Sequence, residues 1–310
     1  MAKTDAGSPA LIKSVAEFTD EIAKSYKPED TVFFYRGQPK DTAQIRESYS
    51  GDQLVVRTTG ILPAILRPDC KAKESEIYNH VMTECAQEFD GLLSHVEILS
   101  KMQHYGVPTR LLDVTTNALS ALYFACSDEY GQPNDGNNSI VNIFKAAKAD
   151  IKSFDSDTIA ILTSLPRFEE EVKKEIKERA KQAKDDFKAF NEDEHKDEDK
   201  RYVRKLLHEV KKERPAFEDI IRPKHLLRSF FCIPRKNNVR IIRQHGAFIV
   251  FGLTEEVPVM PDKIFIKNDS KKAILDELKS LGVFQSTLFP ELYQVAIDIR
   301  NRCKSAKAAK

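Results

Sequence analysis

One stretch of this chain, residues 102–125, reads MQHYGVPTRLLDVTTNALSALYFA. It places His104 and Tyr105 before a Gly-Val-Pro bend, and a polar loop then leads into a strongly apolar segment. Asn117 stands directly before that segment, where an asparagine favours the start of a helix, so the sequence predicts a buried helix over 118–127. Polar groups beside such apolar runs are costly to bury unless they have partners or a task. The stretch therefore predicts a ligand site or a set of structural hydrogen bonds.

A second stretch, FFYRGQ at residues 33–38, places an arginine directly after apolar side chains. The β-branched and aromatic run at 31–35 predicts a buried strand that presents Arg36 at its end. A rigidly mounted guanidinium suits two-point binding of a phosphate or carboxylate, and Gly37 then lets the backbone approach the bound group. The alternative is an internal ion pair between Arg36 and Asp113, because a buried arginine is normally paired.

The loop within residues 102–125 groups several polar side chains. Hydroxyl, amide and carboxylate groups of this kind suit a polar ligand such as a ribose. The candidates are His104, Tyr105, Arg110, Asp113, Thr115, Thr116 and Asn117. Structural alternatives stay open for three of them: a helix cap for Asn117, a satisfied structural histidine for His104, and a partner that fixes Arg110 for Asp113.

A third stretch, NVRIIRQHGAFIVFG at 238–252, carries Gln244 and His245 immediately before an apolar strand. A glutamine side chain can donate and accept hydrogen bonds, but it is no general base at neutral pH. If the chemistry needs a carboxylate, this group must come from another segment. The candidates Glu47, Glu74 and Asp113 cannot be ranked by spacing alone. A fourth stretch, LGVFQSTLFPEL at 281–292, also sets polar groups beside apolar ones.

Hydrophobic periodicity gives the remaining elements. Helices are expected at 10–26, 74–93, 96–104, 271–281 and 288–302. Strands are expected at 140–144, 230–233, 240–242, 247–251 and 263–266, and residues 42–68 are expected to form an irregular connection. The expected divisions are an N-terminal helix at 1–30, a first core part at 31–166, a helical insertion at 167–214, a second core part at 215–302 and a loose tail at 303–310.

The insertion at 167–214 consists mostly of charged residues of both signs and contains no glycine. Glu and Lys recur at spacings of three and four, which favours a solvated helical pair, with the tip near 191–200. One interpretation is a solubilising surface excursion. The other is a docking arm for a partner protein such as an antitoxin or a chaperone.

Composition bounds the class of protein. The chain has 310 residues and a net charge of +1 from 49 basic and 48 acidic side chains. This length can bury a sizeable core, and the balanced charge gives no global basic field for nucleic acid. No apolar run is long enough for a signal peptide or a membrane span, so we expect a cytoplasmic protein without membrane attachment.

Several well-defined sites have no support in the sequence. The five cysteines are far apart, which argues against a disulfide framework or a CxxC metal site. The HExxH, GxxxxGK[ST], GxGxxG and GxSxG motifs do not occur, and the seven histidines are scattered. We therefore expect no metal, P-loop, Rossmann or α/β-hydrolase site.

Together, the stretches FFYRGQ, QHYGVPTRLLDVTTNALSALYFA, RIIRQHGAFIVFG and LFPEL resemble the FRG domain family, which is named for its aromatic-x-Arg-Gly element. The resemblance runs from about residue 31 to 299, interrupted by the charged insertion. It implies that 31–166 and 215–302 are the two parts of an FRG core.

A more distant similarity is to NAD-consuming ADP-ribosyltransferases of the R-S-E kind. It implies an α+β fold with a split β core flanked by helices. Such enzymes carry an arginine at the end of the first core strand, a Ser/Thr-centred strand before a buried helix, and a glutamate near a later strand. Arg36 is similar to the first element, and Thr115 or Thr116 to the second. Gln244 falls where the glutamate lies, which is a departure from the pattern.

The resemblance implies NAD⁺ as co-substrate, with its phosphates near Arg36 and its nicotinamide ribose near 113–117. The expected catalytic residues are Arg36, Thr115 and Gln244, and the expected binding residues are Arg36, Gly37, His104, Tyr105, Arg110, Asp113, Thr116 and Asn117. The expected function is an ADP-ribosyltransferase, acting as a toxin or defence effector on RNA or a host protein. Two alternatives stay open: a non-catalytic nucleotide-sensing module, and an RNA-directed nuclease toxin with His104 as acid/base and Arg36 as phosphate clamp.

Overall fold

A computed structural model describes residues 11–25, 31–40, 44–50, 53–59, 61–70, 72–134, 136–184, 186–191, 201–218 and 220–291. The strands are β1 (Leu11–Ile12), β2 (Thr31–Gln38), β3 (Gln44–Ser50), β4 (Gln53–Thr59), β5 (Leu111–Thr115), β6 (Ser139–Ala147), β7 (Ile151–Ser153), β8 (Ser229–Ile233), β9 (Gly246–Phe251) and β10 (Asp262–Ile266). The helices are α1 (Val15–Ser25), α2 (Glu74–Glu84), α3 (His95–His104), α4 (Ala118–Cys126), α5 (Asp157–Ser164), α6 (Glu170–Ala183), α7 (Phe187–Asn191), α8 (Tyr202–Glu213), α9 (Pro223–Leu226), α10 (Val239–Arg243), α11 (Lys271–Ser280) and α12 (Gln285–Leu288).

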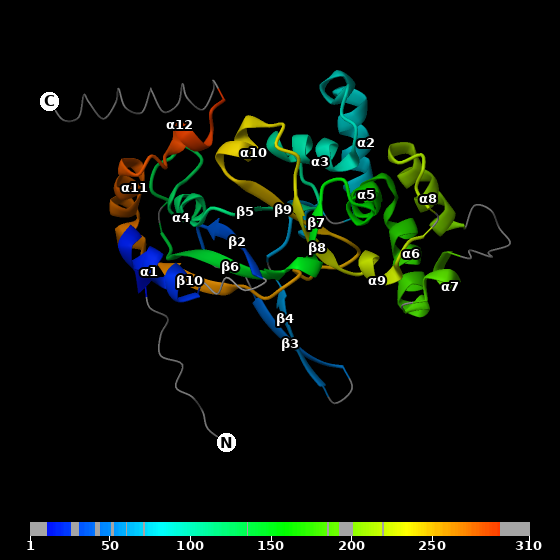
Figure 1. The fold of residues 1–310 in the computed structure, drawn as a ribbon, viewed down its shortest axis with the longest axis horizontal. Helices are drawn as coiled ribbons and strands as arrows, with labels where there is room; N and C mark the ends of the chain where they lie inside the picture. Colours follow the sequence, from blue (N-terminus) through cyan, green and yellow to red (C-terminus); the bar gives the residue numbers. More distant parts are fainter. Residues whose placement is uncertain are drawn as a thin grey trace.

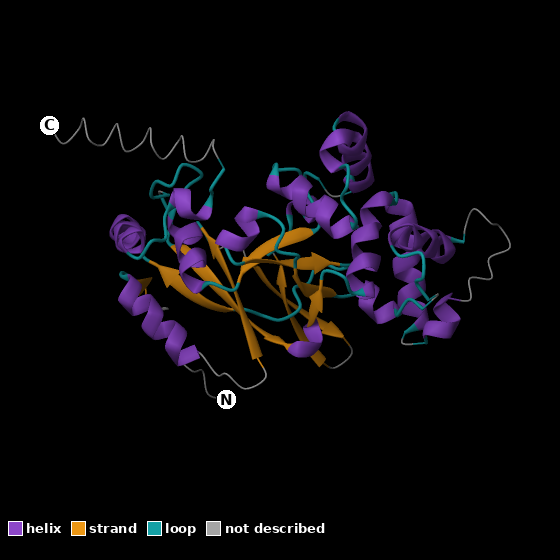
Figure 2. Cartoon of the chain, turned by 45° about the horizontal axis from the view of Figure 1, so that its top comes forward, coloured by secondary structure: helices purple, strands orange, loops and turns teal. Residues whose placement is uncertain are grey.

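The central element is a mixed, mostly antiparallel sheet. Within the described ranges its eight strands follow the order β1-β10-β6-β2-β5-β9-β8-β7, and only the two outer pairs, β1–β10 and β7–β8, are parallel. The hairpin β3–β4 forms a separate two-stranded sheet. Figure 2 shows the main sheet as one layer with helices packed around it. The expectation of an α+β fold whose β-sheet is flanked by helices is confirmed at this level.

Two groups of helices cover the same face of the sheet. Tyr35 on β2 is opposite Thr115 on β5, so their side chains point to one face. On this face, Tyr35 packs in a cluster with α1, α4, α11 and α12, whereas Leu111 on β5 packs with α2, α3 and α5 to α9. Figure 1 shows the first group at the left and most of the second group at the right, with α3 and α10 near the centre. The boundary between the groups therefore lies over the junction of β2 and β5.

Several predicted elements were found with small shifts, and others were wrong. The predicted strand at 240–242 is instead the short helix α10, because the Asn238 side chain accepts a hydrogen bond from the Arg240 N–H and caps the turn. The irregular connection expected at 42–68 contains the β3–β4 hairpin. A helix was expected at 288–302, but the structure has the shorter helix α12, which ends at Leu288. Residues 292–302 lie outside the described residues.

The charged insertion contains the expected helices, and one face of α6 and of α8 packs into the core, so these helices are not solvated on all sides. Helices α6 and α8 bury apolar side chains against α5 and α9, among them Ile176, Leu206 and Val210. Lys173 on α6 is also buried, and its ammonium group lies 2.9 Å from Glu74 Oε2. The expected tip at 191–200 lies, apart from Asn191, outside the described residues. Among the helices that are described, none has the length and apolar character needed to cross a membrane.

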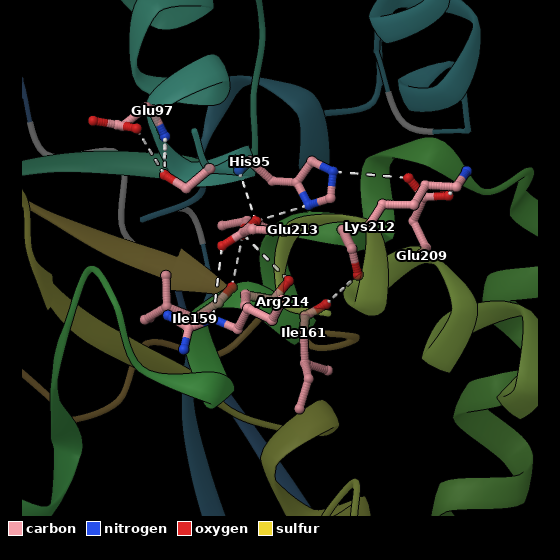
Figure 3. A network of polar contacts seen from close by, with 12 residues as sticks. His95, Glu97, Ile159, Ile161, Glu209, Lys212, Glu213 and Arg214 are labelled. Atoms are coloured by element: carbon pink, nitrogen blue, oxygen red, sulfur yellow. Dashed lines mark hydrogen bonds and ion pairs between the residues drawn. The ribbon is translucent and has the colours of Figure 1, made fainter. Parts of the chain in front are cut away.

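The last turn of α8 also fixes the start of α3. The Glu213 carboxylate accepts a hydrogen bond from the His95 backbone N–H at 2.8 Å, and the same Oε2 lies 3.0 Å from His95 Nδ1. Figure 3 shows this contact together with Glu209, which lies 3.7 Å from His95 Nε2. A carboxylate at a helix N-terminus is favoured by the exposed N–H groups there. The insertion thus positions α3, whose other end carries His104.

Gly37 is needed for packing between β2 and α4. A Cβ atom at this position would lie 1.9 Å from the Ala121 carbonyl oxygen and 2.6 Å from the Ala125 nitrogen. The group that approaches this backbone is therefore α4 of the same chain. This corrects the prediction that Gly37 makes room for a bound ligand.

We predict that Gly37→Ala destabilises the protein by about 3 kcal/mol or more, because a backbone carbonyl cannot rotate away from the added methyl group. Urea unfolding followed by circular dichroism measures the change. The matched control is Gly246→Ala, where the new Cβ would meet its nearest neighbour at an ordinary 3.6 Å and where we expect a change within about 1 kcal/mol. Equal effects of the two substitutions would contradict this packing account.

A second prediction concerns the buried triad of Glu74, Arg110 and Lys173. Burial alone would raise the pKa of Glu74, but the charges and hydrogen bonds of Arg110 and Lys173 outweigh it and lower this pKa. Because the folded-state pKa is depressed, the triad's contribution is present above the ordinary carboxyl pKa of about 4.3 and is lost as pH falls through the lower folded value.

We therefore expect Glu74→Ala to cost about 3–5 kcal/mol at pH 7, because two buried cations lose their partner. The control is Glu170→Ala, since Glu170 contacts the same Lys173 at 3.3 Å but is partly exposed, and its removal should cost less than about 1 kcal/mol. Urea unfolding at pH 7 and in the acid range tests both statements. The triad account fails if the two variants unfold alike at pH 7.

Candidate functional site

The sheet is almost unpaired between β2 and β5. Their register contains one residue pair, Tyr35 with Thr115, whereas β2 pairs with β6 over all eight of its residues and β5 pairs with β9 over all five. Each strand is therefore held firmly on its outer side and weakly at this junction. We call this junction the seam.

A cavity of about 260 Å³ lies at the seam. We call it the seam cavity. Its walls come from β2, α3, β5, α4, α10 and β9, together with Phe289 after α12. Of the residues predicted from sequence, it is lined by Arg36, Gly37, His104, Asp113, Thr115 and Gln244. Segments far apart in the sequence thus meet at one place, and four of the predicted binding residues and all three predicted catalytic residues lie there.

Arg36 reaches across the seam. Its Nη1 donates a hydrogen bond to the Asp113 backbone carbonyl at 2.6 Å. No ion pair between the two side chains is observed in the described part of the chain, so the contact differs from the predicted Arg36–Asp113 pair. Burial lowers the pKa of Arg36, the Asp113 carboxylate opposes this, and Arg67 adds to it. The guanidinium still remains protonated at neutral pH.

One nitrogen of this guanidinium has no partner. Arg36 Nε is buried, and no described residue accepts a hydrogen bond from it. A buried donor left unsatisfied costs roughly 1–3 kcal/mol, and more where the group is charged. Arg36 is therefore a cation, poorly solvated and incompletely bonded, in the wall of a cavity. Such a group favours an anionic, hydrogen-bond-accepting ligand.

The two threonines of the loop differ in their surroundings. Thr115 is buried; its hydroxyl donates to the Gln244 carbonyl at 2.7 Å and accepts from the Asn117 N–H at 2.9 Å. This hydroxyl ties β5 to the turn before β9, which positions both segments. The catalytic role predicted for Thr115 stays a prediction. Thr116 is exposed and lies outside the seam cavity, with its N–H bonded to the His245 carbonyl.

Asn117 caps helix α4. Its side-chain oxygen accepts hydrogen bonds from the N–H groups of Leu119 and Ser120, at 2.9 and 3.3 Å. The helix-cap alternative is therefore confirmed, and Asn117 does not line the seam cavity. The cap fixes where α4 begins and so places Phe124, which does line it.

Arg110 lies away from the seam cavity, which corrects its predicted binding role. It is almost fully buried and forms a two-point contact with Glu74, in which Nε is 2.9 Å from Oε1 and Nη2 contacts Oε2. Its Nη1 also donates to the Phe251 carbonyl. Arg110 thus joins β5 to α2, and Asp113 does not serve as its partner. Glu74 is occupied by this triad, and the Glu47 side chain lies outside the described part of the chain.

Gln244 and His245 form the turn between α10 and β9. The Gln244 side-chain amide donates to the Leu288 carbonyl at 3.1 Å, and the residue lines the seam cavity. His245 is exposed and adopts a positive φ of 49°. Gln244 therefore links α10 to the end of α12 and contributes an amide, not a carboxylate, to the cavity wall.

A carboxylate that the sequence analysis did not single out lies beside His104. Glu291, in the stretch LFPEL, has Oε1 at 3.6 Å from His104 Nε2. Its Oε2 is buried, and no described residue donates to it. The separation from His104 is slightly longer than a hydrogen bond, as catalytic pairs often are without a ligand. The stretch was noted, but spacing alone could not show that Glu291 reaches α3.

A second missed residue is Arg240. Its guanidinium stacks over the Phe289 ring, 4.6 Å from the ring centre, and both residues line the seam cavity. The predicted strand at 240–242 would have placed Arg240 in the sheet, whereas α10 brings it over the cavity. Arg36 and Arg240 together make this cavity cationic, with Asp113 as the carboxylate in its lining.

We predict that the pKa of His104 reports this arrangement. It lies below the ordinary value of 6.5 because of burial and the nearby charges of Arg240 and Lys101, against which Glu291 acts. Arg240→Gln should therefore raise the His104 pKa, and Glu291→Gln should lower it further. Nuclear magnetic resonance titration of the imidazole protons measures both shifts. Arg243→Gln, on the exposed side of the same helix, is the control and should leave the titration unchanged. If Arg240→Gln lowered the His104 pKa, or Glu291→Gln raised it, the described arrangement of charges around His104 would be wrong.

Comparison with known proteins finds a match for one part of the chain only. Neither the curated proteins nor the solved structures contain a match. The family model that does match is the FRG domain, over residues 31–133. This range runs from β2 through α4 and includes Arg36, His104, Asp113 and Thr115, whereas Arg240, Gln244 and Glu291 lie beyond it. The predicted second core part at 215–302 stays a prediction. The match supports assigning residues 31–133 to the FRG domain family.

Proposed function

We propose that the seam cavity binds NAD⁺ and that the chain is an NAD-dependent ADP-ribosyltransferase, acting as a toxin or defence effector. The observation that carries this proposal is the buried and unsatisfied Nε of Arg36, a residue that lines the seam cavity. Arginine binds phosphate groups with two parallel hydrogen bonds, and its Nη1 is already held by the Asp113 carbonyl. The diphosphate of NAD⁺ supplies the acceptor oxygens that Nε lacks.

The seam cavity has the size to hold one half of a dinucleotide. At about 260 Å³ it is slightly below the range of about 300–1,000 Å³ that is usual for small-molecule sites. We assign it to the nicotinamide riboside portion, with the diphosphate at Arg36. Phe124 and Phe289 provide apolar surface for a flat ring, and Gln244 and Asp113 provide hydrogen-bonding groups for a ribose.

The reaction breaks the bond between C1′ of the ribose and the nicotinamide nitrogen. The electron pair of that bond leaves with the nicotinamide, and positive charge develops on the ribose. A preorganised electrostatic environment stabilises such a charge better than water does. Asp113 and the Glu291 carboxylate beside His104 are the negative groups placed near the cavity.

His104 is the proposed general base. Burial and the neighbouring cations lower its pKa, so the imidazole is neutral at pH 7 and can accept a proton from the attacking group. Glu291 then stabilises the imidazolium that forms. The structure thus offers a carboxylate–imidazole pair at the cavity, whereas the sequence resemblance led to Gln244.

We predict that Arg36→Ala lowers the rate of nicotinamide release from labelled NAD⁺ by about 100-fold or more, the size of effect known for loss of one preorganised donor from an active site. Arg36→Lys should lose less, because it keeps the charge but not the paired donors. Arg243→Ala is the matched control, since this arginine is exposed and lies outside the cavity lining.

Three outcomes would overturn the assignment. Turnover by Arg36→Ala at the normal rate would remove Arg36 from the mechanism. Binding of NAD⁺ by calorimetry without nicotinamide release would indicate a nucleotide-sensing module. Cleavage of RNA in the absence of NAD⁺ would indicate a nuclease.

A further inference from the structure

A second cavity lies directly beside the seam cavity. Its volume is about 270 Å³. It shares five lining residues with the seam cavity, namely Ser100, His104, Asn238, Ile241 and Phe248. We call it the α3 cavity, because α3 and α10 form the wall between the two. His104 therefore borders both spaces, and a group bound in one lies within reach of a group bound in the other.

The α3 cavity carries an exposed aromatic ring at its edge. Tyr105 is 68% exposed, so its ring is open to a ligand. Its ring meets the His104 ring edge-on, with centres 5.1 Å apart and planes at 84°. Phe154 and Phe248 add aromatic surface inside the cavity. These side chains suit a flat aromatic ligand that stacks on Tyr105.

The polar lining limits what kind of ligand this is. Lys101 and Arg235 lie at the cavity, but Lys101 is 3.0 Å from Glu88, and Arg235 is 3.9 Å from Glu97. Each cation thus has a carboxylate neighbour, which reduces the attraction that it offers to a chain of phosphates. Asn237 and Asn238 also line the cavity, but the Asn237 amide donates to Glu97 Oε1 at 2.9 Å and the Asn238 side-chain oxygen caps α10. Stacking, and not charge, must supply most of the affinity.

We propose that the α3 cavity binds an unpaired nucleobase of single-stranded nucleic acid, and that this base is the acceptor of the ADP-ribosyl group. This inference rests on the proposed function of the seam cavity. A single ring fits a cavity of this size, and base–aromatic stacking is how proteins commonly hold unpaired bases. The acceptor and NAD⁺ are then held on opposite sides of His104.

The shared wall defines the transfer step. A nitrogen of the base attacks C1′ of the nicotinamide ribose, and a new C–N bond forms there while the bond to nicotinamide breaks. The electron pair of the broken bond stays with the departing nicotinamide. The proton of the attacking nitrogen passes to His104, which faces the charges of Glu291, Arg240 and Lys101.

The first test measures binding without NAD⁺. A fluorescent single-stranded RNA of about 12 nucleotides is titrated with the full chain, and anisotropy gives the Kd. We expect Tyr105→Ala to raise the Kd about 5- to 100-fold, the range expected for loss of one base–aromatic stack, and Tyr105→Phe to leave it within about 2-fold. Tyr130→Ala removes another exposed tyrosine, one that lines neither cavity, and should have no effect.

Two features separate stacking from charge. The same RNA in a duplex should bind much more weakly, because its bases are already stacked and paired. The slope of log Kd against log salt concentration should stay below about 2, since both cations at the cavity are ion-paired. A steep slope, or equal binding of the duplex, would overturn the proposal, as would an unchanged Kd for Tyr105→Ala in a variant that melts like the natural chain.

The second test adds labelled NAD⁺. Transfer of label to the single strand, lost in Tyr105→Ala, supports the proposal, whereas label found only in added protein overturns it. If the strand binds through Tyr105 but no nicotinamide is released, the function proposed for the seam cavity has failed and the α3 cavity remains a base-binding site. If nicotinamide is released but the strand does not bind, the inference about the α3 cavity has failed and the function proposed for the seam cavity stands.

Discussion

The sheet is interrupted between β2 and β5, and the site depends on this interruption. One residue pair, Tyr35 with Thr115, joins two strands that are otherwise fully paired on their other sides. The Arg36 guanidinium crosses the seam to the Asp113 carbonyl and takes the place of part of the missing ladder. A strand pair that continued here would fill the space that Arg36 now lines. The same feature therefore weakens the sheet and creates the cavity.

Packing keeps the seam open. Helix α4 rests on Gly37 closely enough that no side chain fits there, and this contact anchors β2 on one side. On the other side, Arg110 fixes β5 to α2 and α6 through Glu74 and Lys173. Glu213 holds the start of α3, so that its end presents His104. The charged insertion thus stabilises the framework of the site from a distance.

The sequence predicted much of this fold because apolar periodicity and caps act locally. The strand at 31–35, the helix after Asn117 and the strand at 247–251 follow from neighbouring residues alone. The short strand β5 was expected to be a loop, since the polar residues Asp113 and Thr115 in it serve the seam. The strand expected at 240–242 became a helix because one side chain, Asn238, caps it.

The site was predictable only in part, because local sequence signals mark some of its residues and contacts between distant segments bring in the others. Arg36, His104, Asp113, Thr115 and Gln244 stand beside apolar runs, which marks them in the sequence, and they do line one cavity. Arg110 stands in the same kind of context, yet it pairs with Glu74. Glu291 has no local signal, because its approach to His104 depends on how the chain after α12 returns to α3. Pairing over such sequence distances is a property of the assembled fold.

The most direct test of the account is a crystal structure of the protein with a non-hydrolysable NAD⁺ analogue. The account predicts that the diphosphate accepts a hydrogen bond from Arg36 Nε and that the nicotinamide ribose lies between Asp113 and His104. An analogue bound elsewhere, or bound at the seam with Arg36 Nε still unsatisfied, would contradict it.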